Sequence, residues 1–175
     1  MPPIPDRIRS IGMNAKIRII SICILLVPVY FFTIGDFYGS GFQTPIFRYQ
    51  EIFLGSFVVF ISNDVYNVIT GFFRGTMIPV VILWCLGFLF LVVNCIVVFV
   101  GRTEFKRILR TSGMLILISG FCFMASIIVR YGPLFHNSTG LAIPLGLPLI
   151  FLIGIWMYRW KDDDENTVTN NPPVP

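Results

Sequence analysis

Few side chains in this sequence suit acid–base, nucleophilic or metal chemistry. The single histidine, His136, lies among turn-forming residues, and no nucleophile and carboxylate stand at a spacing that would complete a catalytic group with it. The sequence also contains no Walker loop, dinucleotide fingerprint, HExxH, GxSxG or CxxC motif. We therefore predict no catalytic residues and no cofactor.

The cysteines offer no metal or redox pattern either. All four fall inside apolar runs, and they are Cys23, Cys85, Cys95 and Cys122. Cys85 and Cys95 are nearly three helical turns apart, so they cannot pair with each other within one helix. We predict no metal site and no disulfide framework, and we interpret the cysteines as small packing residues.

Two asparagines suit other chemistry. Asn94 is the most polar residue within a long apolar run, where an amide usually bonds to a neighbouring helix. We therefore predict an interhelical polar contact at Asn94, with a group that lines a solute path as the alternative. Asn137 begins the sequon Asn-Ser-Thr, which makes it a candidate N-glycosylation site in a host that glycosylates.

Small residues recur at helical spacing in two apolar runs. In the first run, serines repeat every seven residues, which is nearly two turns, and a glycine follows two of them. In the second run, two glycines stand eight residues apart. Small residues let helix backbones approach closely, so we predict helix packing at these positions, against a neighbour in the same chain or in a partner. The predicted packing residues are Ser112, Gly113, Ser119, Gly120, Ser126, Gly146 and Gly154.

The composition indicates a membrane protein. Of 175 residues, 55% are hydrophobic and 13% are charged, whereas a soluble domain carries about 25% charge. This excludes a disordered chain, a coiled coil, a nucleic-acid module and an ordinary cytosolic enzyme. Four apolar runs approach the roughly 20 residues that a membrane helix needs. They are Ile19–Gly35, Ile78–Val100, Thr111–Val129 and Leu141–Tyr158.

The four runs predict an all-α integral membrane protein, built as a bundle of four transmembrane helices in one domain over residues 1–158. Most cations lie before the first run, between the second and third runs, or after the fourth run, and these three segments would share one side of the membrane. The exceptions are Arg48, Arg74 and Arg130. The positive-inside rule then predicts a cell-membrane protein with both termini cytoplasmic and the loop 36–77 outside. The tail 159–175 is acidic, then polar and proline-rich, and we predict it to be disordered.

The outer loop contains two short segments rich in β-branched and aromatic residues, Phe57–Ile61 and Val65–Ile69. Because Ser62, Asn63 and Asp64 supply turn chemistry between them, we predict a β-hairpin. An amphipathic interfacial helix is one alternative. A fifth span over Glu51–Phe73 is another, although it would bury an aspartate in the membrane.

The predicted layout of four spans, a long first outer loop and a short second one is similar to that of claudins. The outer loop here has no cysteine pair and no tryptophan motif, so the resemblance covers the layout alone. We expect a non-enzymatic membrane protein that acts through protein or lipid contacts, as an accessory or assembly subunit or a homo-oligomer. A small channel or transporter is the alternative. We expect no contact with nucleic acid.

Overall fold

The computed structural model describes residues 6–35, 38–101, 105–138 and 140–160, and its fold is mixed α/β. The described helices are Asp6–Leu26 (α1), Ile61–Ile69 (α2), Met77–Val100 (α3), Phe105–Tyr131 (α4) and Gly146–Tyr158 (α5). The described strands are Tyr30–Ile34 (β1), Gly39–Gln43 (β2), Phe47–Ile52 (β3), Gly55–Phe60 (β4), His136–Asn137 (β5) and Gly140–Ile143 (β6). The prediction of an all-α fold is therefore wrong.

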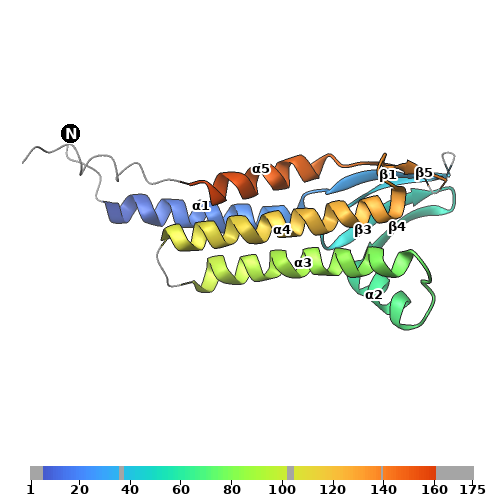
Figure 1. The fold of residues 1–175 in the computed structure, drawn as a ribbon, viewed down its shortest axis with the longest axis horizontal. Helices are drawn as coiled ribbons and strands as arrows, with labels where there is room; N and C mark the ends of the chain where they lie inside the picture. Colours follow the sequence, from blue (N-terminus) through green and yellow to red (C-terminus); the bar gives the residue numbers. More distant parts are fainter. Residues whose placement is uncertain (1–5, 36–37, 102–104, 139, 161–175) are drawn as a thin grey trace, which may run out of the picture.

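The six strands form one antiparallel sheet in the order β4-β3-β2-β1-β6-β5. Strand β1 pairs with β2 on one side and with β6 on the other, so the sheet joins the first half of the chain to its last strands. The sheet lies at one end of the molecule, and α1, α3, α4 and α5 extend from it toward the other end (Figure 1). Among these helices, α3 packs on both α1 and α4, and α4 packs on α5.

Two of the four predicted spans are divided between a helix and a strand. In the run Ile19–Gly35 the helix ends at Leu26 and β1 begins at Tyr30. Pro28 separates them, because proline cannot donate a backbone hydrogen bond and disfavours helix at the residue before it. In the run Leu141–Tyr158, β6 ends at Ile143, Pro144 follows, and α5 begins at Gly146.

Two described helices, α3 and α4, are long and apolar enough to cross a membrane by length and composition. Helix α5 is apolar but has only 13 residues, which is short of the roughly 20 that a span requires. The structure therefore does not support a bundle of four transmembrane helices, and the membrane evidence rests on α3 and α4.

The predicted hairpin in the outer loop is also wrong. Phe57–Phe60 does form a strand, but that strand is part of β4 and pairs with β3. Ser62, Asn63 and Asp64, which we predicted to form the turn, instead lie at the start of the nine-residue helix α2. Asp64 is in the first turn of this helix, where the helix dipole favours a carboxylate. Since the segment Glu51–Phe73 is divided between strands and this short helix, it is not a fifth span.

A group of aromatic side chains joins the sheet to α3 and α4. Tyr30 on β1 lies edge-on to Trp84 on α3, with 5.7 Å between the ring centroids, and Trp84 lies 4.5 Å from the ring of Phe123 on α4. Trp84 Nε1 also donates a hydrogen bond of 3.3 Å to the carbonyl of Pro45, in the turn between β2 and β3. All three rings are buried, so the sheet is fixed to the ends of these helices by packed aromatic contacts.

Candidate functional site

The face of the sheet that points away from the helices carries a row of apolar side chains. Strand alternation places Tyr30 and Phe32 toward the core and Phe31 on the opposite face. The strand register places one residue from each of five neighbouring strands in line across this face. These residues, which we call the aromatic row, are Ile143, Phe31, Phe42, Tyr49 and Val58.

The rings of the aromatic row contact one another directly. Phe42 lies 5.8 Å from Phe31 and 5.5 Å from Tyr49, measured between ring centroids. Phe47 extends this contact from Phe42, at 6.1 Å, toward Phe60, at 6.3 Å. Each such pair contributes about 0.5–1.5 kcal/mol beyond the burial of its area. The surface is therefore preorganised, although Phe31 remains 41% exposed.

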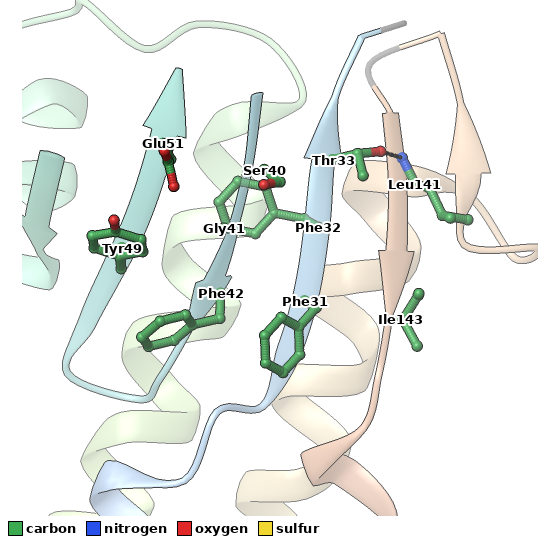
Figure 2. Close-up of a pocket in the computed structure, with 10 residues that line it drawn as sticks. All are labelled: Phe31, Phe32, Thr33, Ser40, Gly41, Phe42, Tyr49, Glu51, Leu141 and Ile143. Carbon is green, nitrogen blue, oxygen red and sulfur yellow. Dashed lines mark hydrogen bonds between the residues drawn. The ribbon is translucent and has the colours of Figure 1, made fainter. Parts of the chain in front are cut away.

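A groove of about 350 Å³ lies against this row. Figure 2 shows Phe31, Phe42 and Tyr49 along one part of it and the smaller Thr33 and Ser40 beside them. Gly41 has no room for a side chain, since a Cβ there would clash with the backbone of Tyr49 and Gln50 and would lie 2.9 Å from the ring of Phe32. The small residues of β1 and β2 thus leave a depression between larger neighbours on β3 and β6.

The chemistry of the groove is that of a binding surface. Its lining is mainly aromatic and aliphatic, with hydroxyl groups from Thr33, Ser40 and Tyr49. Thr33 Oγ1 accepts a hydrogen bond of 3.1 Å from the backbone N–H of Leu141, which ties β1 to β6 at the groove (Figure 2). Glu51 is the one charged residue in the lining. The groove therefore offers apolar contact and a single carboxylate.

A second polar cluster is buried on the inner side of the sheet. Arg48 on β3 and Asp64 on α2 form an ion pair of 3.2 Å, and both side chains are about 10% exposed. Arg130 on α4 lines the same small cavity, and the Tyr30 hydroxyl donates a hydrogen bond of 2.7 Å to Gln43 Oε1 beside it. Residues from β1, β2, β3, α2 and α4 therefore converge there.

Burial dominates the electrostatics of this cluster. It raises the pKa of the Asp64 carboxyl above its ordinary value, although the positive charges of Arg48 and Arg130 act in the opposite direction. Burial likewise raises the pKa of the Tyr30 hydroxyl far above its ordinary value. Sequence reasoning missed this cluster. The available signal was that Arg48 and Arg130 are two of only three cations on the predicted outer side.

The predicted packing serines all lie between α3 and α4 and are buried. Ser119 Oγ donates to the Gly87 carbonyl at 2.8 Å, and Ser126 Oγ donates to the Val80 carbonyl at 2.9 Å. Ser112 Oγ donates to Oδ1 of Asn94, which is fully buried. The polar group of Asn94 therefore contacts α4 within the same chain.

The predicted packing glycines face a different neighbour. A Cβ on Gly113 would meet the backbone of Tyr158 and Gly154 on α5, and one on Gly120 would meet Ile150 and Phe151 of the same helix. Gly154 lies opposite, against Leu117 and Gly113. Gly146 is apart from them, against the backbone of Pro28. The small residues of α4 therefore contact two neighbouring helices: the serines face α3, and the glycines face α5.

The remaining candidate residues are dispersed. His136 and Asn137 form the short strand β5, and Asn137 Nδ2 donates a hydrogen bond of 2.7 Å to the carbonyl of Arg130. The four cysteines are free thiols. Within the described parts of the chain, no group of three histidine, cysteine or carboxylate side chains is placed to hold a metal ion. The predicted disordered tail lies outside the described residues from position 161 onward.

No known family model matches this chain, and no curated protein is significantly similar to it.

Proposed function

We propose that the chain is a non-enzymatic, multi-pass membrane protein whose sheet binds an extramembrane segment of a partner membrane protein, as an accessory or assembly subunit. Helices α3 and α4 are the spans. Large apolar side chains are exposed on α3 at intervals of three and four residues, which is the pattern of a helix face in contact with lipid. These residues are Ile82, Leu86, Leu89, Val93 and Ile96.

The distribution of charge supports an orientation with both termini in the cytoplasm. Lys106, Arg107 and Arg110 lie in the first turns of α4, at the end remote from the sheet (Figure 1). The side chain of Arg18 on α1 lies at the same end of the molecule, because its guanidinium is 5.5 Å from the ring of Phe99, near the end of α3. Cations mark the cytoplasmic side of membrane proteins, so the sheet faces the outside.

The aromatic row is the observation that carries the proposal. On the outer side of a membrane, this face meets water, where contiguous exposed apolar surface marks interaction sites. Aromatic residues are also the residues enriched in the cores of protein interfaces. A groove of about 350 Å³ is too small for a whole folded element, and it suits one or two side chains of a partner segment.

Charge complementarity specifies the kind of segment. Because Glu51 is the one charged group lining the groove, the best partner is an apolar segment that carries a lysine or arginine. The hydroxyl groups of Thr33, Ser40 and Tyr49 beside the rings suit the polar backbone of a peptide better than a hydrocarbon chain.

Photo-crosslinking in native membranes tests this proposal. A photoreactive phenylalanine analogue at Phe42 should form an adduct with an extramembrane segment that contains apolar and basic residues, identified by mass spectrometry of the crosslinked peptide. The substitution Glu51→Lys should abolish that adduct. The same analogue at Leu89, which is exposed on α3, serves as a control and should yield lipid adducts. Lipid adducts alone at Phe42, or a peptide adduct that Glu51→Lys leaves unchanged, would overturn the proposal.

A further inference from the structure

Helix α2 has one face fixed to the rest of the protein. Asp64 on this helix forms the buried ion pair with Arg48 of β3, at 3.2 Å. Ile61 is partly buried against the hydrophobic core. Ile61 and Asp64 also line one small cavity with Met77 and Val80, which lie in the first turn of α3. The inner face of α2 therefore packs against the start of α3, at the end of α3 that adjoins the sheet (Figure 1).

The outer face of α2 carries large apolar side chains that are mostly exposed. Ile69 and the following Phe72 are both 77% exposed, and Tyr66 is 66% exposed. Tyr66 and Ile69 lie on one face of the helix, because they are three residues apart. The Phe73 N–H donates a hydrogen bond of 2.9 Å to the Asn67 carbonyl, which folds the chain back on α2 and keeps Phe72 near the helix. We call Tyr66, Ile69 and Phe72 the α2 patch, and contiguous apolar surface of this kind marks an interaction site.

The place of the α2 patch beside α3 brings it to the membrane surface. This step rests on the proposed function, in which α3 crosses the membrane. The 24 residues of α3 extend about 36 Å at about 1.5 Å per residue, whereas the hydrocarbon core is about 30 Å thick. The first turn of α3, against which α2 packs, therefore lies at the boundary between hydrocarbon and headgroups. Residues 73–76 alone separate Phe72 from α3, so the patch lies at the same level.

The chemistry of this segment fits phospholipid. Aromatic side chains gather where membrane proteins cross the headgroup layer, and a helix with an apolar face lies in the plane of that layer. Arg74 adds a positive charge. It is exposed, and its Nε donates a hydrogen bond of 3.0 Å to the Gly71 carbonyl, which holds the side chain beside the end of α2. A guanidinium matches the geometry of a phosphate group. The exposed residues Ile78 and Ile82 begin the lipid-facing side of α3 directly after this segment.

We propose that α2 and residues 70–74 form an anchor in the outer leaflet, in which the α2 patch inserts between phospholipid headgroups and Arg74 binds their phosphate groups. Because the ion pair of Arg48 and Asp64 joins α2 to β3, the anchor holds the sheet in a fixed orientation to the membrane. The anchor is separate from the partner-binding groove, since α2 lies on the inner side of the sheet and the groove lies on its outer face.

Photo-crosslinking of the full-length protein in phosphatidylcholine nanodiscs tests the anchor. A photoreactive phenylalanine analogue at Phe72, or separately at Tyr66, keeps an aromatic ring at the position. Both should form phospholipid adducts, and fragmentation of these adducts should place the crosslink at the headgroup, the glycerol or the first acyl carbons. The same analogue at Leu89, near the middle of α3, should react with deeper acyl carbons. If Leu89 forms lipid adducts and neither Phe72 nor Tyr66 does, the anchor is overturned and the spans stand. If Leu89 forms none, α3 is not a span and both proposals fail.

Phe53 is the matched control for exposure. It is 97% exposed in the turn between β3 and β4. Strand pairing places this turn level with Ile34, the end of β1 that lies away from α1. The analogue at Phe53 should therefore form no lipid adduct in a disc with a single bilayer. Equal lipid adducts at Phe53 and Phe72 would show that the reaction reports exposure alone, and would overturn the proposal. A protein adduct in place of lipid at Phe72 would overturn it as well.

Lipid selectivity tests the role of Arg74. In nanodiscs that mix phosphatidylcholine with anionic phosphatidylglycerol, adducts at Phe72 should be enriched in phosphatidylglycerol by about fivefold over the bulk ratio, which corresponds to about 1 kcal/mol for one cation at an anionic surface. Arg74→Gln should return the adducts to the bulk ratio. Arg110→Gln is the control and should keep the enrichment, because Arg110 is an exposed cation in the first turns of α4, at the opposite end of the molecule. Enrichment that is absent, or that Arg74→Gln leaves unchanged, would overturn the phosphate contact.

Discussion

Ser119 on α4 donates its hydroxyl hydrogen to the backbone carbonyl of Gly87 on α3, at 2.8 Å. Seven residues further along α4, Ser126 donates to Val80, which lies seven residues back along α3. Seven residues before Ser119, Ser112 donates to Asn94. The serine repeat of α4 therefore stays in step with α3 over four helical turns, and each serine ties the two helices together in the same register.

Removing the hydroxyl at the middle of this register should weaken the helix pair modestly. Ser119→Ala should lower the free energy of unfolding by about 0.6–1 kcal/mol, which is the usual value of a polar contact between membrane helices. Ser119→Val should cost about 1–3 kcal/mol more, because a larger side chain there overpacks the contact. The measurement is equilibrium unfolding in detergent.

The control for these variants is Ser40→Ala, which changes an exposed serine on the sheet. Its free energy of unfolding should stay within about 0.5 kcal/mol of the wild-type value. Ser119→Val with wild-type stability would show that α3 and α4 do not meet at this position.

The second prediction concerns the glycines that face α5. A Cβ on Gly113 would lie 2.5 Å from the backbone nitrogen of Tyr158 and 2.7 Å from the carbonyl oxygen of Gly154. Because both atoms are backbone, Gly113→Ala should force α4 and α5 apart at a cost of about 1–3 kcal/mol. Gly120→Ala should cost less, since its nearest neighbour at 3.1 Å is a carbon of the Phe151 ring, which can move. Thermal unfolding of both variants measures the difference, and an equal or reversed order would contradict this packing.

The sequence predicted the central helices well because their signals are local. The run Ile78–Val100 coincides almost completely with α3, and the run Thr111–Val129 lies within α4. The serine and glycine spacing within Thr111–Val129 is likewise a property of one helix. A pattern of this length is compatible with a helix and is too long for a single strand.

The sheet could not be predicted in the same way, because its pairings are distant in sequence. Thr33 and Leu141 are bonded across 108 residues, and no local pattern indicates that β1 and β6 are neighbours. An apolar run also does not distinguish a helix followed by a strand from one long helix. Pro28 lies between α1 and β1, and Pro144 lies between β6 and α5. A proline in an apolar run can equally lie inside a kinked helix, so neither residue identified the boundary. The ion pair of Arg48 and Asp64 depends on this sheet, so it too was beyond local reasoning.

The third prediction concerns the sequon. Asn137 Nδ2, the atom to which a glycan would be attached, donates a hydrogen bond of 2.7 Å to the carbonyl of Arg130 near the end of α4. Attachment of a glycan competes with this bond, so we expect Asn137 to remain unmodified in a glycosylating host. Electrophoretic mobility before and after endoglycosidase treatment measures this directly.

The same bond predicts a stability effect. Asn137→Ala should lower the free energy of unfolding by about 1 kcal/mol, because the Arg130 carbonyl loses its donor. Thr139→Ala destroys the sequon but keeps the amide of Asn137, so it separates the loss of a glycan from the loss of this hydrogen bond. Complete glycosylation with unchanged stability would contradict both expectations.

The fourth prediction concerns pH. Burial raises the pKa of Asp64 above the ordinary carboxyl value near 4. The folded protein therefore binds the Asp64 proton more tightly than the unfolded chain does. By linkage, the contribution of Asp64 to stability is fully present below the ordinary pKa and is lost as pH rises through the folded pKa. Tyr30, which lines the same cavity, stays neutral across this range because burial raises the pKa of its hydroxyl further.

Asp64→Asn should remove this part of the pH dependence. Between about pH 4 and neutrality, Tm of the variant should fall less steeply with rising pH than Tm of the wild type, when both are measured at the same ionic strength. Glu51→Gln is the matched control, because Glu51 lies on the outer face of the sheet and should leave the slope unchanged. A wild-type slope that Asp64→Asn does not alter would show that this carboxyl has the same pKa in the folded and unfolded chain. That result would show that the positive charges of Arg48 and Arg130 offset the effect of burial on the Asp64 pKa.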